Sequence, residues 1–218
     1  MLGQKNMLDE PLECFQSERY FIHDEPLRKD DAKYCLSTIN RVFKENGITF
    51  IIGYGTLLGA MREHDFIAHD NDIDTIVWGK DLQKVRDLAP ELKKYGVNLK
   101  CYVLPWILTY EYKGISCDIE FIHEAIWPWR KWFCLLHENY IRKSFFENTE
   151  ELEFLGEYYT VPANPEKMLT YWYGSDWRIP QSKGPRMESY FFFWRYIHRF
   201  VRRCIRWYKR HILKNGKK

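Results

Sequence analysis

The sequence predicts one α/β domain, of the α+β kind, with a mixed β-sheet flanked by helices and followed by a C-terminal amphipathic helix. Two segments, residues 30–46 and 81–95, repeat apolar side chains at helical spacing. Short apolar runs bounded by glycine, proline or polar residues indicate strands. At 218 residues the chain is long enough to bury one core.

The elements of this domain can be placed in order along the chain. Residues 1–29 are expected to be an irregular lead-in, and residues 30–186 the catalytic domain. Gly47 ends the first helix just after its C-cap. The remaining expected elements are strands at 48–52, 97–103, 107–112 and 116–122, a hairpin around Gly156 at 152–161, and a helix at 165–173 that begins with Pro165.

A glycine turn follows the first apolar strand. Gly53 and Gly55 flank Tyr54, and Thr56 is expected to cap the short helix that comes next. A strand, a glycine turn and a helix N-terminus present backbone N–H groups to an anion, most often a phosphate. The turn is weak evidence alone, but an acidic strand follows it closely.

That acidic strand carries Asp70, Asp72 and Asp74 at alternate positions. Side chains at alternate positions of a strand share one face, so the three carboxylates are expected to lie together. Partly buried like charges repel, and their desolvation is costly. A hard divalent cation, Mg²⁺ or Mn²⁺, removes this difficulty. The alternative is a solvated acidic loop, which the apolar residues Ile73 and Ile76 make less favourable.

A later strand, residues 116–122, places Asp118 and Glu120 on one face by the same alternation. A carboxylate on a neighbouring strand is what a metal site built across a sheet requires. An ordinary strand with its polar face in water explains the pattern equally well from the residues alone.

One motif spans residues 55–74 and reads Gly55-Thr56-Leu57-Leu58-Gly59-Ala60, then Arg62, Phe66-Ile67 and Asp70-Asn71-Asp72-Ile73-Asp74. With this motif the sequence resembles the LicD/fukutin-related family. The resemblance continues at residues 116–121, 161–169 and 173–177, and covers about residues 30–180. One departure is Ala68-His69, where the family usually has Pro-Trp before the first Asp.

The resemblance implies a nucleotidyltransferase-like fold and a Mg²⁺-dependent (or Mn²⁺-dependent) phosphotransferase. Such enzymes move phosphocholine or a similar alcohol phosphate from a CDP-linked donor to a glycan hydroxyl, in cell-surface polysaccharide or lipopolysaccharide synthesis. The acceptor is a glycan or a lipid-linked glycan. The site residues expected here are Asp72, Asp74 and Asp118 as catalytic residues, the same three with Asp70 as metal ligands, and Gly55, Thr56 and Arg62 as ligands of the donor phosphates.

Two other functions remain open. The first is transfer of a nucleoside monophosphate, which releases pyrophosphate where the phospho-substituent reaction releases CMP. The second is a non-catalytic, membrane-bound partner of a glycan-assembly complex. The intact acidic residues argue against that last interpretation.

Cysteine usage and the chain's start indicate a compartment. The six cysteines contain no Cys-x-x-Cys pair, which argues against a zinc site and a disulfide framework. The first residues lack the apolar core of a signal peptide, and no apolar run approaches the length of a membrane span. We therefore expect a reducing cytoplasm, with the protein peripheral on the inner face of the cell membrane.

That membrane expectation comes from residues 187–218. Ten Lys or Arg residues and no acidic residue follow Glu188. Residues 187–213 place apolar and aromatic side chains on one helical face and cations on the other, as helices that lie in anionic membrane surfaces do. Packing on the domain is an alternative. Binding to nucleic acid is disfavoured, because no base-reading motif accompanies the charge.

Overall fold

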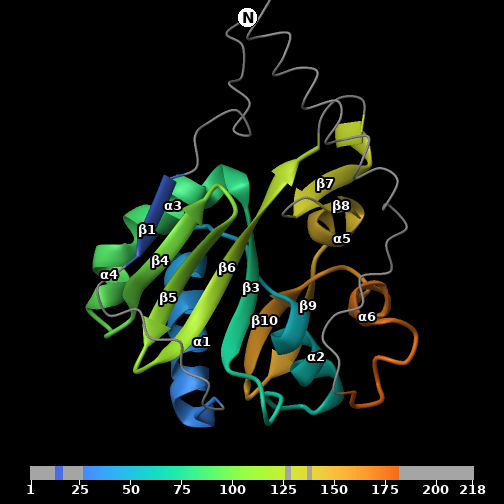
Figure 1. Cartoon of the computed structure of the whole chain (residues 1–218), viewed down its shortest axis with the longest axis horizontal. Helices are drawn as coiled ribbons and strands as arrows, with labels where there is room; N and C mark the ends of the chain where they lie inside the picture. Colours follow the sequence, from blue (N-terminus) through green and yellow to red (C-terminus); the bar gives the residue numbers. More distant parts are fainter. Residues whose placement is uncertain (1–12, 17–26, 126–128, 137–138, 182–218) are drawn as a thin grey trace, which may run out of the picture.

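The computed structural model of the chain describes residues 13–16, 27–125, 129–136 and 139–181. In these residues one sheet runs in the order β1-β4-β5-β6-β3-β2-β10-β9, and β7 and β8 extend it from β6 (Figure 1). Its strands are β1 (Glu13–Gln16), β2 (Phe50–Ile52), β3 (Asp72–Trp78), β4 (Asn98–Leu104), β5 (Ile107–Tyr112), β6 (Ile115–Glu124), β7 (Phe133–Leu136), β8 (Asn139–Arg142), β9 (Glu150–Phe154) and β10 (Glu157–Val161).

The sheet is mixed, as predicted. Strand β3 pairs in parallel with β6, and β10 pairs in parallel with β2. The other neighbouring strands are antiparallel. The helices are α1 (Lys29–Glu45), α2 (Tyr54–Arg62), α3 (Leu82–Asp87), α4 (Ala89–Lys93), α5 (Ser144–Glu147) and α6 (Pro165–Tyr173), with short 3-10 turns η2 (Gly79–Asp81) and η3 (Trp129–Lys131).

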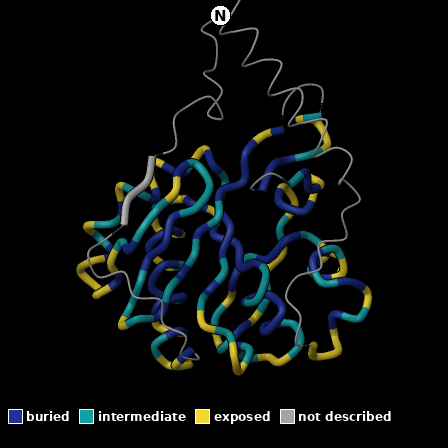
Figure 2. Tube along the Cα trace, viewed as in Figure 1, coloured by how far each residue is buried: buried dark blue, intermediate teal, exposed yellow. Residues whose placement is uncertain are grey.

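Helices cover both faces of the sheet at its centre. The alternate residues Ile73, Cys117 and Ile119 of β3 and β6 are fully buried on the α1 side. Figure 2 shows the burial concentrated along these central strands. The intervening positions carry the acidic groups and face α2 and α6, because Ile76 lies beside Gly53 and Trp172. The acidic groups are therefore on the sheet face opposite α1.

Helix α1 packs on the sheet as its apolar spacing predicts. Its buried side chains are Ala32, Cys35, Leu36, Thr38, Ile39, Val42 and Phe43. Gly47 follows it with a φ of +65°, a left-handed conformation that costs glycine little. The predicted first helix is confirmed.

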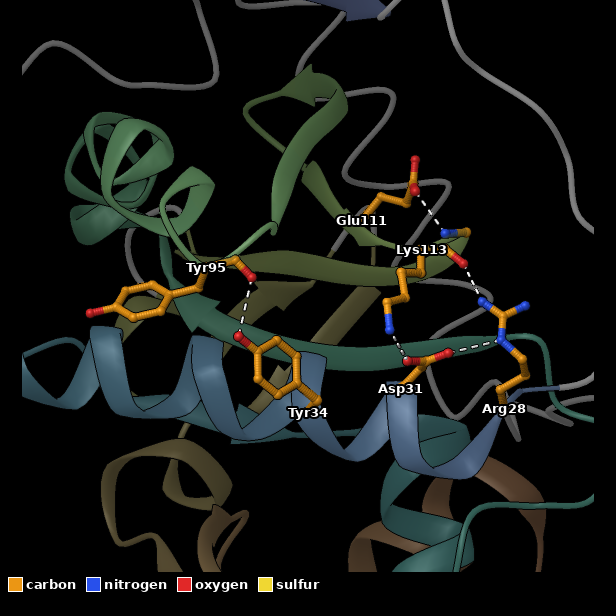
Figure 3. Close-up of polar contacts among 7 residues, drawn as sticks. Arg28, Asp31, Tyr34, Tyr95, Glu111 and Lys113 are labelled. Atoms are coloured by element: carbon orange, nitrogen blue, oxygen red, sulfur yellow. Dashed lines mark hydrogen bonds and ion pairs between the residues drawn. The ribbon is translucent and has the colours of Figure 1, made fainter.

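Polar contacts tie α1 to the β5–β6 turn (Figure 3). Arg28 Nε donates to Asp31 Oδ2 at 2.9 Å, and Lys113 Nζ donates to Asp31 Oδ1 at 3.0 Å. Arg28 also donates to the Lys113 carbonyl. Further along, the Tyr34 hydroxyl donates to the Tyr95 carbonyl at 3.2 Å. Hydrogen bonds from Arg28 and Lys113 lower the pKa of Asp31. These pairs are solvent-exposed, so they orient the helix more than they stabilise it.

The prediction of one continuous helix at residues 81–95 is wrong. Residues 79–93 instead form η2, α3 and α4, and α3 and α4 meet at Leu88. Pro90 lies in the first turn of α4, where its missing N–H leaves no bond unmade, but it cannot continue a helix from before it. The apolar spacing still holds, because Leu82, Val85 and Leu92 are buried.

Other elements were not expected from the sequence. Residues 13–16, placed in an irregular lead-in, form β1 against β4. Strands β7 and β8 and helix α5 were also not predicted. The Trp129 ring packs edge-on against Phe133 with centroids 6.5 Å apart, whereas Trp132 is 55% exposed.

Two predictions concern residues beyond these. The C-terminal helix expected at residues 187–213 lies outside the described residues, so it and the boundary at residue 186 stay predictions. Within residues 13–16, 27–125, 129–136 and 139–181, no helix has both the length and the apolar character needed to cross a bilayer.

Candidate active site

Helix α2 begins earlier than the sequence indicated. Strand β2 ends at Ile52, Gly53 is the N-cap, and the first helical residue is Tyr54, whose φ is +37°. The expected capping by Thr56 is wrong, because no side chain caps this N-terminus. Thr56 Oγ1 instead accepts a hydrogen bond from the Asp74 backbone N–H at 2.9 Å. Thr56 thus ties α2 to β3.

Gly55 is the point at which two carboxylates meet. Its backbone N–H donates to Asp74 Oδ2 at 2.9 Å. A Cβ atom built on Gly55 would lie 2.5 Å from Asp70 Oδ2 and 3.0 Å from Asp74 Oδ2. Only a residue without a side chain leaves room for both oxygens. They gather at the positive end of the α2 dipole, which favours negative charge.

Asp70 lies in a different structural element from the one predicted. Strand β3 begins at Asp72, so Asp70 lies in the preceding turn and the prediction of three alternating strand residues is wrong for it. The Asp70 N–H donates to the Ile67 carbonyl at 3.0 Å, and the Asp70 carbonyl accepts from the Leu27 N–H at 2.9 Å. The Asp70 and Asp72 carboxyl groups lie close enough to act on each other. A turn therefore completes the acidic group.

Strand β6 adds a further carboxylate beside β3. Parallel pairing places Asp118 next to Asp74 in register. The Thr109 hydroxyl, on β5, donates to Asp118 Oδ1 at 2.7 Å and fixes its orientation. Glu120, the next residue on that face, acts electrostatically on the Tyr54 phenol. Asp118 is thus brought to Asp74, while Glu120 lies near the start of α2.

Two further side chains near these acids were not assigned a role from the sequence. Lys100 lies at an irregularity in the β4–β5 register, is only 7% exposed, and donates to Ser116 Oγ at 2.8 Å. Its charge acts on Asp118. Tyr173, at the end of α6, lies within reach of the charges of Asp70, Asp72 and Asp74. A lone lysine within an apolar strand was the available signal for Lys100.

Comparison with known proteins places this geometry in a family. The family model described as "LicD/FKTN/FKRP, nucleotidyltransferase domain" matches residues 47–164, more than half of the chain. The chain belongs to this family. The matched segment starts just before β2 and contains α2, the acidic turn, β3 and β6.

One relative is an uncharacterized protein of Rickettsia typhi, 28% identical over 110 residues, which cover 50% of this chain. The match spans only 33% of that relative's length. The LicD-family chain is therefore similar to a third of a larger protein.

Solved structures with partial similarity include an antibiotic adenylyltransferase and an antibiotic-resistance factor. The lincosamide antibiotic adenylyltransferase LnuA, bound to lincomycin, has a TM-score of 0.43 and 15% identity over 67% of this chain and 87% of its own. ANT(2″)-Ia, in complex with adenylyl-2″-tobramycin, has a TM-score of 0.41 and 18% identity over 59% and 67%. Likeness at this level carries no argument about function. The family match and the mixed sheet identify a nucleotidyltransferase-like domain of the LicD family.

The acidic groups of this LicD domain resist ionisation. Burial, followed by the charge of Asp72, raises the pKa of Asp70 to about 6. Burial raises the pKa of Asp118 to about 6, against the hydrogen bond from Thr109. Burial also raises the pKa of Asp72, and it raises that of Asp74 well above its ordinary range. Asp74 as a residue is partly exposed, but protein atoms surround its carboxylate.

These carboxylates fit a hard divalent cation. Among the described residues, no three His, Cys, Asp or Glu side chains are already arranged around one point as a metal-binding set. Mg²⁺ does not need one, because it commonly takes one or two carboxylates and fills its other positions with substrate phosphates and water. The Asp70 and Asp74 oxygens that meet at Gly55 suit this coordination. The metal-binding role of Asp70, Asp72, Asp74 and Asp118 stays a prediction.

We expect the metal-free protein to be more stable at pH 5 than at pH 7.5. Asp70 and Asp118 have a pKa of about 6 when folded, against an ordinary value of 3.8. The folded state therefore binds more protons than the unfolded state, and stability falls as pH rises from about 4 to 6. After allowance for solvent screening, each group contributes on the order of 1–2 kcal/mol.

Thermal unfolding with EDTA at both pH values measures this effect. The matched variant is Asp70→Asn with Asp118→Asn, whose unfolding temperature is expected to differ less between the two pH values. An equal difference in wild type and variant would contradict the assignment to these two carboxyls.

Proposed function

We propose that this protein is a Mg²⁺-dependent (or Mn²⁺-dependent) enzyme that transfers a phospho-substituent from a CDP-linked donor to a glycan hydroxyl. The substituent is phosphocholine or a similar alcohol phosphate, and the acceptor belongs to a cell-surface polysaccharide or lipopolysaccharide. Membership of the LicD family supports this reaction class. The observation that carries the proposal is the convergence of Asp70 and Asp74 at Gly55, next to Asp118.

The metal would be held by Asp72, Asp74 and Asp118 with Asp70. Bound there, it would neutralise the donor phosphates and polarise the reacting oxygens. Catalysis would rest mainly on positioning and on charge neutralisation in a partly water-excluded site. The buried acidic groups contribute by fixing the place at which a phosphate can approach the sheet.

The donor phosphates are proposed to bind at Gly55, Thr56 and Arg62, and the three residues contribute in different ways. The Gly55 N–H donates to Asp74 in this structure, so its contribution is to orient that carboxylate. The Thr56 N–H lies in the first turn of α2, where helical N–H groups have no partner of their own. Arg62 Nη1 donates to the Trp177 carbonyl at 3.3 Å and its Nε to Glu63 at 2.8 Å. The other N–H groups of the guanidinium can meet a phosphate.

The reaction is tested with purified protein, Mg²⁺ and a panel of CDP-linked donors that includes CDP-choline. We expect release of CMP, increased by the right glycan acceptor and abolished by EDTA. Release of pyrophosphate from a nucleoside triphosphate would favour nucleotidyl transfer. No turnover of any donor, with intact folding, would favour the non-catalytic role.

We also propose that residues 187–213 bind an anionic membrane surface. The basis is their cationic amphipathic pattern alone, since they lie outside the described residues.

Deletion of residues 187–218 is expected to abolish co-sedimentation with phosphatidylserine-containing vesicles and to leave turnover of a soluble acceptor unchanged. Binding by the full chain should weaken with salt, which screens headgroup attraction over about 8–10 Å. Equal sedimentation of the two proteins would contradict the proposal, and loss of folding would favour packing of this segment on the domain.

A further inference from the structure

The end of helix α6 lies against the start of α2. Trp172 is fully buried, and its ring stacks on the Tyr54 ring with centroids 4.3 Å apart and planes 22° apart. Tyr54 immediately precedes Gly55, where the two carboxylates meet. The residue after Trp172 is Tyr173, so this stacking sets the position of Tyr173 relative to the acidic groups.

A second contact holds the chain after Tyr173. Gly174 has a φ of +93° and turns the chain away from the helix axis. The Trp177 carbonyl, three residues on, accepts from Arg62 Nη1 at 3.3 Å. Tyr173 is thus placed between two points of attachment, the Trp172–Tyr54 stack and the Arg62–Trp177 hydrogen bond.

The Tyr173 side chain lies near the acidic groups. Asp74, Asp70 and Asp72 all act electrostatically on its phenol, and Arg62 acts in the opposite sense. The ring packs against the hydrophobic core. Among the described residues, no group forms a hydrogen bond with its hydroxyl. A neighbouring phenol on the same helix differs, because the Tyr171 hydroxyl donates to the Tyr140 carbonyl at 3.5 Å.

We propose that the Tyr173 hydroxyl donates a hydrogen bond to a phosphate oxygen of the nucleoside diphosphate donor. The inference rests on the proposed function for the identity of that donor. Ionised carboxylates only accept hydrogen bonds, so they repel an approaching phosphate and offer it no donor. Arg62 supplies a charged donor near them, and Tyr173 supplies a neutral O–H. Tyr173 is therefore a further substrate-contacting residue.

The test separates the hydroxyl from the ring. Tyr173→Phe removes only the hydroxyl and keeps the packing of the ring. Tyr171→Phe is the matched control, because it removes a hydroxyl two residues away on the same helix whose partner is Tyr140. Thermal unfolding of both variants in the absence of ligand is expected to match the wild type, which excludes a structural explanation.

Titration calorimetry with CDP-choline and Mg²⁺ measures the contact. Tyr173→Phe is expected to weaken binding by about 10- to 150-fold, the effect of one lost hydrogen bond to a charged group. Tyr171→Phe is expected to bind within about twofold of the wild type. Unchanged binding by Tyr173→Phe would overturn the inference and leave the proposed function intact, as would equal weakening in both variants.

The two proposals fail in distinguishable ways. If the wild-type protein neither binds nor turns over any CDP-linked donor, the proposed function fails. The same titration with ATP and Mg²⁺ then tests Tyr173, because a nucleotidyl donor presents the same phosphate chemistry. Weaker ATP binding by Tyr173→Phe alone would uphold the inference, and unchanged binding would overturn it. Binding of neither nucleotide by the wild type would overturn both proposals.

Discussion

Asp72→Asn and Asp74→Asn are each expected to lower transfer by at least about a hundredfold while the fold survives. Both carboxylates lie on the β3 face opposite α1, and Asp74 meets Asp70 at Gly55. An amide keeps the shape of the side chain and removes the charge that a divalent cation requires. In Asp74→Asn the Gly55 N–H can still donate to the oxygen of the new amide, so the α2–β3 contact persists.

Turnover measured as CMP release over a range of Mg²⁺ concentrations checks this expectation. Asp81→Asn is the matched control, because Asp81 lies just beyond β3 and makes no side-chain capping bond. It is expected to keep wild-type turnover. In EDTA, the two site variants should unfold at a higher temperature than the wild type, since like-charge repulsion and carboxylate desolvation are relieved. Wild-type turnover by either variant at limiting Mg²⁺ would refute the assignment.

Gly55→Ala is expected to lower transfer by about a hundredfold or more. The added methyl group would lie 2.5 Å from Asp70 Oδ2 and 3.0 Å from Asp74 Oδ2. The distance to Asp70 is shorter than any ordinary van der Waals contact. At least one carboxylate must move, and a displacement of about 1 Å at a reacting centre can cost about a hundredfold. Activity is expected to fall more than stability, because side-chain oxygens rather than backbone atoms must give way.

Gly59→Ala provides the contrasting variant in the same helix. Its methyl group would lie 2.6 Å from the Asp65 backbone carbonyl, and no atom of the acidic groups is among its nearest neighbours. We expect it to lower the unfolding temperature while the folded fraction keeps its turnover. Comparison of turnover and unfolding temperature for the two variants checks both expectations. Full activity in Gly55→Ala would show that the carboxylate positions at Gly55 are not needed for transfer.

Much of the site was open to prediction from local pattern and family resemblance. The alternation of Asp72 and Asp74 placed both on one strand face, as β3 has them. The same rule applied to Asp118 and Glu120 in β6. The local pattern also indicated Asp70 and the glycine turn, and the family motif includes both. These features are local, because side-chain periodicity and turn chemistry depend on residues a few positions apart.

The sequence by itself therefore determined the fold class, the family, and which residues supply charge. Only the tertiary structure decided how those charges meet: the parallel register that sets Asp118 beside Asp74, and the Gly55 N–H directed at Asp74. It also decided the approach of Asp70 from a turn, and the delivery of Tyr173 from α6. These contacts join residues far apart in the chain, so strand register and helix packing, which no local spacing encodes, set their geometry.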